Sequence, residues 1–142
     1  MPNFKPGQYS VVVHRDALDD LERLWGESEN AAAMISVFLE ELQDNQEILD
    51  NLTRNKFVHE LVPRYGVEMW AGQQQKKRNL WRLKVWNFDG DLINYRVIYA
   101  FHPLENRYYV LGIPSRDFNY DASHPTSKRI LKAYDDLDIP KY

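Results

Sequence analysis

Hydrophobic and polar positions follow a helical period through the first third of this chain. A short run rich in valine and tyrosine, 8–14, has the composition of a buried strand. Apolar residues then recur every three or four positions over 17–25, which predicts an amphipathic helix that Gly26 ends. The same spacing over 34–52 predicts a second, longer helix, with glutamate and aspartate on its other faces.

The period changes to that of β-strands from Leu80 onward. Residues 80–86, 95–102 and 107–113 form three apolar segments, with Asp89-Gly90 as a turn signal after the first. They predict a three-stranded antiparallel meander. A short helix is expected over 123–137, with Pro125 in its first turn. Residues 54–75 show no clear period, and we expect mixed loop there.

This order of elements predicts an α+β domain. Two N-terminal helices pack on one face of a small antiparallel sheet, a short C-terminal helix closes the chain, and the other face of the sheet stays available. A length of 142 residues suits one domain, 1–142, with its own core.

Composition narrows the class of protein. Hydrophobic residues make up 44% and charged residues 27%, which argues against disorder and fibrous repeats. No apolar run reaches the roughly 18 residues of a membrane span, and the N-terminus lacks the apolar core of a signal peptide, so we expect a cytoplasmic protein without a membrane partner. The absence of cysteine excludes disulfides and thiol catalysis. The histidines are too scattered for a recognisable metal-binding spacing, so we expect no metal, and we expect no small-molecule cofactor either.

The net charge of −3 hides an uneven distribution. Residues 15–50 hold two basic side chains against eleven acidic ones, a balance of −9. Residues 76–132 hold eleven basic side chains against five acidic ones, a balance of +6. The acidity of the whole chain therefore does not exclude a nucleic-acid partner for the second half.

Alternation in the first predicted β-strand of the meander separates a basic face from an apolar one. Arg82, Lys84 and Trp86 share one face, and Trp81 with its apolar neighbours shares the other and is expected in the core. If the hairpin is centred on Gly90, Lys84 lies opposite Arg96; a centre shifted by half a residue puts Arg96 on the other face. Such a cluster either meets an anion, or each cation pairs with an Asp or Glu or extends into water.

Two further groups of residues fit contact with RNA. Lys76, Lys77 and Arg78 precede the strand, and tryptophans and tyrosines are interleaved with the cations. Cations that neutralise phosphates and rings that stack on bases are what single-stranded RNA requires, although aromatic residues in strands more often belong to the core.

The segment after the last strand carries Arg116, Tyr120 and His124. Functional side chains often lie in such loops. The imidazole of His124 exchanges a proton readily near neutral pH, and a position at a helix N-terminus disfavours its charged form, which keeps it available as a base. The alternative is that His124 only caps the helix or meets solvent.

Three runs, RLKVW at 82–86, YRVIYAF at 95–101 and YYVLGIPSRDFNY at 108–120, resemble the C-terminal half of toxins of the RelE/ParE superfamily. The resemblance implies the small RelE-like fold and neutralisation by a cognate antitoxin protein. RelE-type members cleave mRNA in the ribosomal A site, whereas ParE-type members poison DNA gyrase.

Carried over by position, the resemblance implies roles for individual residues. Arg82 and Lys84 match a basic pair, Arg96 and Arg116 match phosphate-stabilising arginines, and Tyr120 matches a tyrosine of the nuclease members. The implied reaction is attack of a ribose 2′-OH on its own 3′-phosphate, with Tyr120 or His124 as base or acid.

The sequence therefore predicts an endoribonuclease toxin acting on mRNA, with the ribosome and an antitoxin as partners. The predicted site consists of a catalytic group and an RNA-binding group: Arg82, Lys84, Arg96, Arg116, Tyr120 and His124, then Lys76, Lys77, Arg78 and Trp86. Two alternatives stay open, a non-catalytic gyrase inhibitor of the ParE kind and a module that binds RNA without cutting it.

Overall fold

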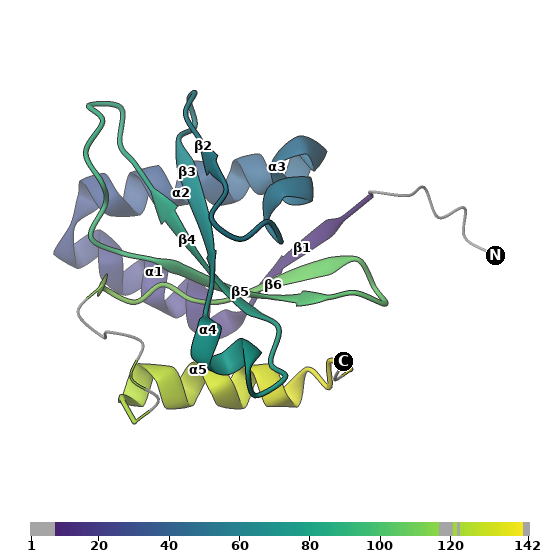
Figure 1. Cartoon of the computed structure of the whole chain (residues 1–142). Coiled ribbons are helices and arrows are strands. Elements are labelled where there is room, and N and C mark those ends of the chain that lie inside the picture. The colour runs from purple at the N-terminus through teal and green to yellow at the C-terminus, as the bar shows by residue number, and fades with distance from the viewer. Residues whose placement is uncertain (1–7, 117–120, 122, 141–142) are drawn as a thin grey trace.

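A six-stranded sheet forms the centre of the computed structural model, which describes residues 8–116, 121 and 123–140 (Figure 1). The strands are β1 (Ser10–Val13), β2 (Val58–His59), β3 (Tyr65–Met69), β4 (Leu80–Val85), β5 (Val97–His102) and β6 (Arg107–Gly112). Their spatial order is β1-β6-β5-β4-β3-β2. β1 lies parallel to β6, with Ser10 opposite Arg107, and every other neighbouring pair is antiparallel.

Five helices accompany the sheet in the described part of the chain. They are α1 (Arg15–Glu27), α2 (Glu29–Asp44), α3 (Gln46–Asn51), α4 (Ala71–Gln74) and α5 (Pro125–Asp136). The predicted α+β class is confirmed, with its two N-terminal helices and its short C-terminal helix. Among these helices, none combines the length and the apolar character needed to traverse a bilayer.

The predicted meander is confirmed in β4, β5 and β6, and its predicted register holds over residues 80–83. Leu80 pairs with Ala100 and Leu83 with Val97, so the ladder is centred on position 90. Gly90 has φ +84°, a left-handed conformation that glycine adopts without a steric penalty, which is why the turn falls there. Nearer the turn the register shifts, because Trp86 pairs with Leu92 and the backbone N–H of Ile93 binds the carbonyl of Val85. Residues 94–96 therefore span the position opposite Lys84, and the prediction that Lys84 lies directly opposite Arg96 is wrong.

The expectation of mixed loop for 54–75 is wrong. This segment contains β2, β3 and α4, and β3 pairs with β4 along its whole length, from Tyr65 opposite Val85 to Met69 opposite Trp81. Gly66 and Glu68 interrupt the hydrophobic pattern of the strand: Gly66 is buried against the Trp86 ring, and the partly exposed Glu68 lies opposite Arg82. The strand is therefore defined by its pairing with β4 rather than by its own alternation.

The single helix expected over 34–52 is two helices. Asn45 ends α2, and its side-chain oxygen accepts a hydrogen bond from the backbone N–H of Ile48 at 3.2 Å, which caps α3. Ser28 caps α2 in the same way at the preceding junction, where α1 ends and the Ser28 hydroxyl accepts from the backbone N–H of Ala31. Gly26 lies within the last turn of α1.

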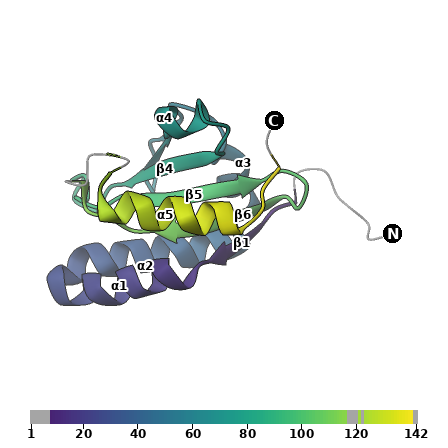
Figure 2. The ribbon, with the colours of Figure 1, turned by 90° about the horizontal axis from the view of Figure 1, so that it is seen from below.

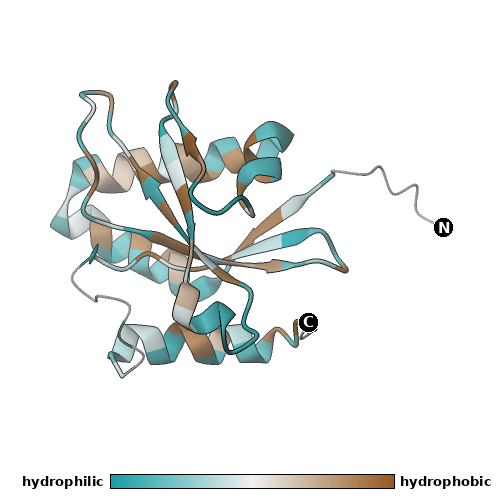
Figure 3. Ribbon diagram, viewed as in Figure 1, coloured by the Kyte–Doolittle hydropathy of each residue, from teal (hydrophilic) through white to brown (hydrophobic). Residues whose placement is uncertain are grey.

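Apolar side chains pack against both faces of the sheet. On one face α1, α2 and α3 cover residues such as Leu83, Tyr99 and Val110. On the other, Ile130 and Tyr134 of α5 pack with a smaller set of strand residues: Leu80, Ile98, Ala100 and Leu111. Figure 2 shows α1 and α2 side by side as a layer, and Figure 3 shows the largely hydrophobic central strands between banded helices. The second face is therefore only partly available, because α5 covers its β5–β6 end.

A buried ion pair fastens α5 to α1. The Asp20 side chain is fully buried and accepts two hydrogen bonds from the Arg129 guanidinium, at 2.9 and 2.6 Å, and one from the backbone N–H of Ile113 at 2.8 Å. Next to this pair, α5 approaches β6 so closely that a Cβ on Gly112 would lie 3.0 Å from the Cδ1 of Ile130. These contacts fix α5 and thereby set how much of the sheet stays uncovered.

Candidate nucleic-acid interface

Five side chains of β3, β4 and their ends lie where α5 leaves the sheet uncovered. They share one face by strand alternation, and we call this set the open face: Arg64, Glu68, Arg82, Lys84 and Trp86. The predicted grouping of Arg82, Lys84 and Trp86 on one face is thereby seen in the structure, and its opposite face carries the buried Trp81, as expected.

Glu68 is the partner of both predicted strand cations. It lies directly opposite Arg82 in the ladder, accepts a short hydrogen bond from the Arg82 guanidinium, and accepts a second from Lys84 Nζ at 3.3 Å. About 30% of each of these three side chains is exposed, so solvent and a ligand can reach them. Of the two alternatives that the sequence leaves open, the cations therefore pair with a carboxylate. Arg82, Lys84 and Glu68 together carry a net charge of +1.

The two cations change the acidity of the Glu68 carboxyl group. Partial burial alone would raise its pKa, but the hydrogen bonds and positive charges of Arg82 and Lys84 outweigh burial and hold the pKa below its ordinary value. Glu68 is thus ionised at neutral pH. Sequence reasoning missed this residue because the expected loop at 54–75 concealed the strand that brings it opposite Arg82.

Trp86 supports a stacked cation at the end of β4. The Arg64 guanidinium lies 4.5 Å from the centre of the indole ring, a cation–π distance, and its Nε lies 3.6 Å from the Glu60 carboxylate. The indole also lies over Gly66, where a Cβ would approach it to 3.4 Å. Trp86 is half-buried, so its ring is a fixed platform beside Lys84.

Arg96 is inside the molecule rather than on the open face. Only 5% of it is exposed, and its Nη1 donates to the backbone carbonyls of Ile93 and Tyr95 at 2.8 and 3.2 Å. These bonds hold the segment that leads into β5. The geometry therefore assigns Arg96 a structural role at this end of the sheet.

Arg116 and His124 lie near the same end of the sheet as Lys84. Arg116 is exposed, and its backbone N–H binds the carbonyl of Asn94 at 2.9 Å. His124 caps α5, because its Nδ1 accepts from the backbone N–H of Thr126 at 3.1 Å. It lines a hollow of about 210 Å³ that also includes Tyr95 and Ser115. Tyr120 lies outside the described residues.

The cap determines which nitrogen of His124 can react. Since Nδ1 accepts a hydrogen bond, the neutral ring carries its proton on Nε2. In this neutral tautomer the Nε2–H is a hydrogen-bond donor only, since loss of its proton would leave an imidazolate, and the basic Nδ1 is occupied by the cap. The observed geometry therefore assigns His124 to capping α5, and a role as a general acid requires that Nδ1 release the N–H of Thr126 and take up a second proton.

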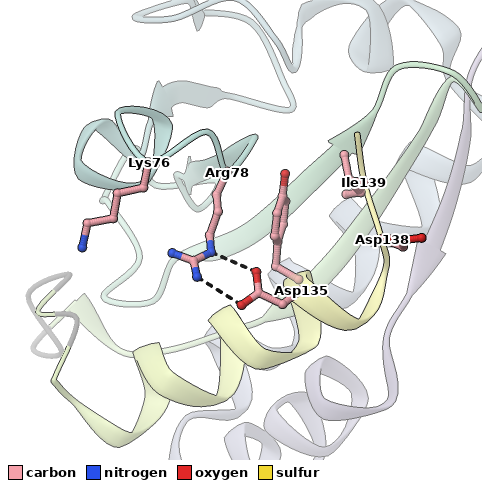
Figure 4. A pocket seen from close by; sticks show the side chains of 6 residues that line it. Lys76, Arg78, Asp135, Asp138 and Ile139 are labelled. Atoms are coloured by element: carbon pink, nitrogen blue, oxygen red, sulfur yellow. Dashed lines mark hydrogen bonds and ion pairs between the residues drawn. The ribbon is translucent and has the colours of Figure 1, made fainter. Parts of the chain in front are cut away.

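The basic run at 76–78 lies at the opposite end of β4. Arg78 donates two hydrogen bonds to the Asp135 carboxylate, at 3.0 and 3.1 Å, in a hollow of about 510 Å³ (Figure 4). Asp135 lies near the end of α5 and His124 caps its start, about 16 Å apart along the helix axis. Lys76 and Lys77 are exposed, and Figure 4 shows Lys76 extending away from the ion pair. The structure thus separates these three residues from the other candidates.

Most of the interleaved aromatic residues belong to the core. Trp70, Trp81 and Tyr99 are 5%, 7% and 2% exposed, which leaves Trp86 and the half-buried Tyr95 within reach of a ligand. Within the described ranges, no three histidine or acidic side chains are grouped so that they could hold a metal ion.

Comparison with protein-family models, with curated proteins and with solved structures finds no match for this chain. The arrangement of the open face is therefore the basis on which its function is proposed.

Proposed function

We propose that this protein is the toxin of a toxin–antitoxin pair and an endoribonuclease that cuts mRNA at the open face. The observation that carries the proposal is a carboxylate, Glu68, held between Arg82 and Lys84 on an accessible sheet surface. A base beside two cations is the minimum that transfer of a phosphodiester to a neighbouring hydroxyl requires.

In the proposed reaction, Glu68 takes the proton of a ribose 2′-OH. The 2′-oxygen then attacks the adjacent phosphorus, and the bond from phosphorus to the 5′-oxygen breaks. Arg82 and Lys84 stabilise the additional negative charge on the phosphate oxygens. The products are a 2′,3′-cyclic phosphate and, once the leaving oxygen has received a proton, a 5′-hydroxyl.

We assign the proton donor to His124, acting as an imidazolium once Nδ1 has released the N–H of Thr126, with Tyr120 as the alternative. Ser115, which shares the hollow with His124, bridges to Tyr95, the residue before Arg96. Because Ile93 binds the carbonyl of Val85 and Tyr95 bridges to Ser115, the donor and the cations belong to the same end of the sheet. Arg116 is exposed there for a flanking phosphate.

The remaining predicted residues bind RNA in this proposal. The Trp86 ring and the Arg64 guanidinium form a stacked pair on which an unpaired base can continue the stack. Lys76 and Lys77, at the far end of β4, contact a more distant region of the RNA backbone. Arg78 contributes less, because Asp135 already neutralises it.

The deciding experiment is the Glu68→Gln variant, assayed on labelled RNA and on mRNA in translating ribosomes with mapping of new 5′ ends. We expect cleavage to fall about 10²-fold or more, the usual contribution of a general base, while RNA affinity stays equal or rises. Glu60→Gln is the matched control, since Glu60 is exposed and approaches only Arg64.

Wild-type cleavage by Glu68→Gln would exclude Glu68 as the base. If the wild-type protein instead leaves all RNA intact but inhibits DNA supercoiling by gyrase, the ParE-like alternative replaces the proposal. Binding to RNA without either effect would identify an RNA-binding module.

A further inference from the structure

An apolar groove opens beside the N-terminal helices, on the opposite side of the sheet from α5. It has a volume of about 150 Å³ and is lined by α2 and by residues 62–64 and 85–88. Phe38 and Val85 form its floor, since both are buried in the core beneath α2.

The rim of this groove exposes unusually large apolar side chains. Val37 is 50% exposed, Val62 73% and Phe88 74%, and Leu61 beside Val62 is 74% exposed. A partner that covered these side chains would gain about 25 cal/mol of binding free energy for each Å² of apolar surface removed from water. Clusters of this kind around a concave site are typical of protein-binding surfaces.

The charge around the groove is negative. Glu41 lines the groove. Val37 and Glu41 also line an adjacent hollow of about 280 Å³, together with Glu40 and Asp44. α2 contains no lysine or arginine. The one basic residue that lines the groove, Arg64, is already stacked on Trp86 and close to Glu60.

We propose that the apolar groove binds an amphipathic segment of a partner protein that combines bulky apolar residues with lysine or arginine. The apolar side chains enter between Val37, Val62 and Phe88, and the basic ones meet Glu40, Glu41 and Asp44. The charge of this surface repels nucleic acid, so the partner is a polypeptide. The groove does not include Glu68, Arg82 or Lys84, but it shares Arg64 and Trp86 with the proposed RNA platform, so a bound partner would compete with RNA there. The inference itself does not depend on the proposed ribonuclease activity.

The test is selection of binding peptides from a random 16-residue library on the full chain, followed by measurement of the selected peptides by fluorescence anisotropy. We expect sequences with apolar residues at helical spacing and with lysine or arginine beside them. Replacing their basic residues by glutamate should weaken binding at least tenfold.

Variants of the chain locate the binding site. Phe88→Ser and Val37→Ser should each weaken the peptides at least tenfold, and Glu41→Lys should remove the preference for basic peptides. Leu104→Ser is the matched control, since Leu104 is also 74% exposed but does not line the groove. Circular dichroism establishes that each variant is folded.

Three outcomes would overturn the inference. Selection of acidic peptides, or of none, would remove the assigned partner chemistry. Binding that Phe88→Ser and Val37→Ser leave unchanged would place the site elsewhere. A wild-type dimer in light scattering that Phe88→Ser converts to a monomer would make a second copy of the chain the occupant.

Discussion

Glu68 combines two properties in the proposed mechanism: it is ionised, and it is attached to the cations that must receive the substrate phosphate. A phosphate oxygen entering between Arg82 and Lys84 competes with the carboxylate for their hydrogen bonds. RNA binding would therefore loosen Glu68 at the moment when it is needed as a base. In the proposed mechanism, Arg82 and Lys84 therefore bind Glu68 in the absence of RNA and bind the substrate phosphate when RNA is present.

The pH dependence of cleavage tests this arrangement. Because Arg82 and Lys84 lower the pKa of Glu68, its carboxylate stays deprotonated until the pH falls below the ordinary glutamate value of about 4.3. A plot of kcat/KM against pH should show no loss of base between pH 7 and pH 5. Lys84→Met removes one cation and should move the acidic limb to higher pH, and an unmoved limb would assign the base to another group.

Protonation of Glu68 also weakens the fold. A carboxyl group whose pKa is lower in the folded state stabilises the protein above its unfolded pKa, and that contribution disappears as the pH falls through the folded pKa. Acid unfolding of Glu68→Gln should therefore be less steep than that of the wild type.

Asp20 is the residue whose removal should cost most stability. Asp20→Asn leaves the Arg129 guanidinium without its buried counter-charge and weakens the bond to the N–H of Ile113. We expect the free energy of unfolding to fall by about 3 kcal/mol, the lower end for a broken buried pair, because Arg129 is partly exposed. Urea unfolding measures the loss.

Asp19→Asn is the control for that experiment. Asp19 is adjacent in sequence and exposed, so its substitution should change the urea midpoint little. Equal effects of the two variants would contradict the assignment of the cost to the buried pair.

At the scale of elements, α5 depends on its histidine cap. His124→Ala removes the acceptor for the N–H of Thr126 and should cost about 1 kcal/mol, whereas His124→Asn supplies an amide oxygen in its place and should preserve stability. If His124 is the proton donor, both variants lose cleavage. Stable His124→Asn protein that still cleaves RNA would transfer that duty to Tyr120.

The close approach of α5 to β6 predicts a second effect. Gly112→Ala would place its methyl group 3.0 Å from Ile130 Cδ1 and 3.2 Å from Arg129 Nη2. We expect about 1–3 kcal/mol of destabilisation from overpacking, measured by thermal or urea unfolding. Gly72→Ala is the control, because a Cβ there meets nothing within 4 Å.

Elements with their own local signals could be predicted from the sequence, and β3 could not. Gly90 and the alternation of β4 and β5 determine the register of the meander, so the shared face of Arg82, Lys84 and Trp86 followed from the sequence. β3 is a strand because it pairs with β4, and its own sequence does not show the alternation of a strand. Glu68 was therefore missed together with β3. The burial of Arg96 was also missed, since an arginine that binds carbonyls of its own loop leaves no mark in a pattern of alternation.

At the scale of the whole molecule, the two charge regions correspond to different surfaces. The acidic residues of 15–50 lie on the helical layer, whereas the strand cations lie on the open face across the sheet. An RNA strand can therefore bind the open face with the sheet between it and most of the acidic side chains. In the proposed function, this uneven charge would orient the protein so that its open face meets the RNA.

The salt dependence of RNA binding reports how many phosphates are contacted. If Arg82, Lys84 and Arg116, together with Lys76 and Lys77, neutralise one phosphate each, the logarithm of the affinity should fall with the logarithm of the salt concentration with a slope of about −3.5. Lys76→Ala with Lys77→Ala should make that slope shallower by about 1 if the RNA reaches the far end of β4. An unchanged slope would confine the RNA to the open face.

The pairing of β1 with β6 delays completion of the sheet while the chain is being synthesised. β1 is made before the other described strands and lies at the edge of the sheet that they form, but β6, which it pairs with, follows 97 positions later, from Ser10 to Arg107. Ribosomes add about 5–20 residues per second, so the first strand waits roughly 5–20 seconds for its partner. Asp20 waits longer still, because Arg129 follows 109 positions after it. The growing chain therefore completes its sheet, and with it the catalytic surface we propose, only after residue 112 has been made.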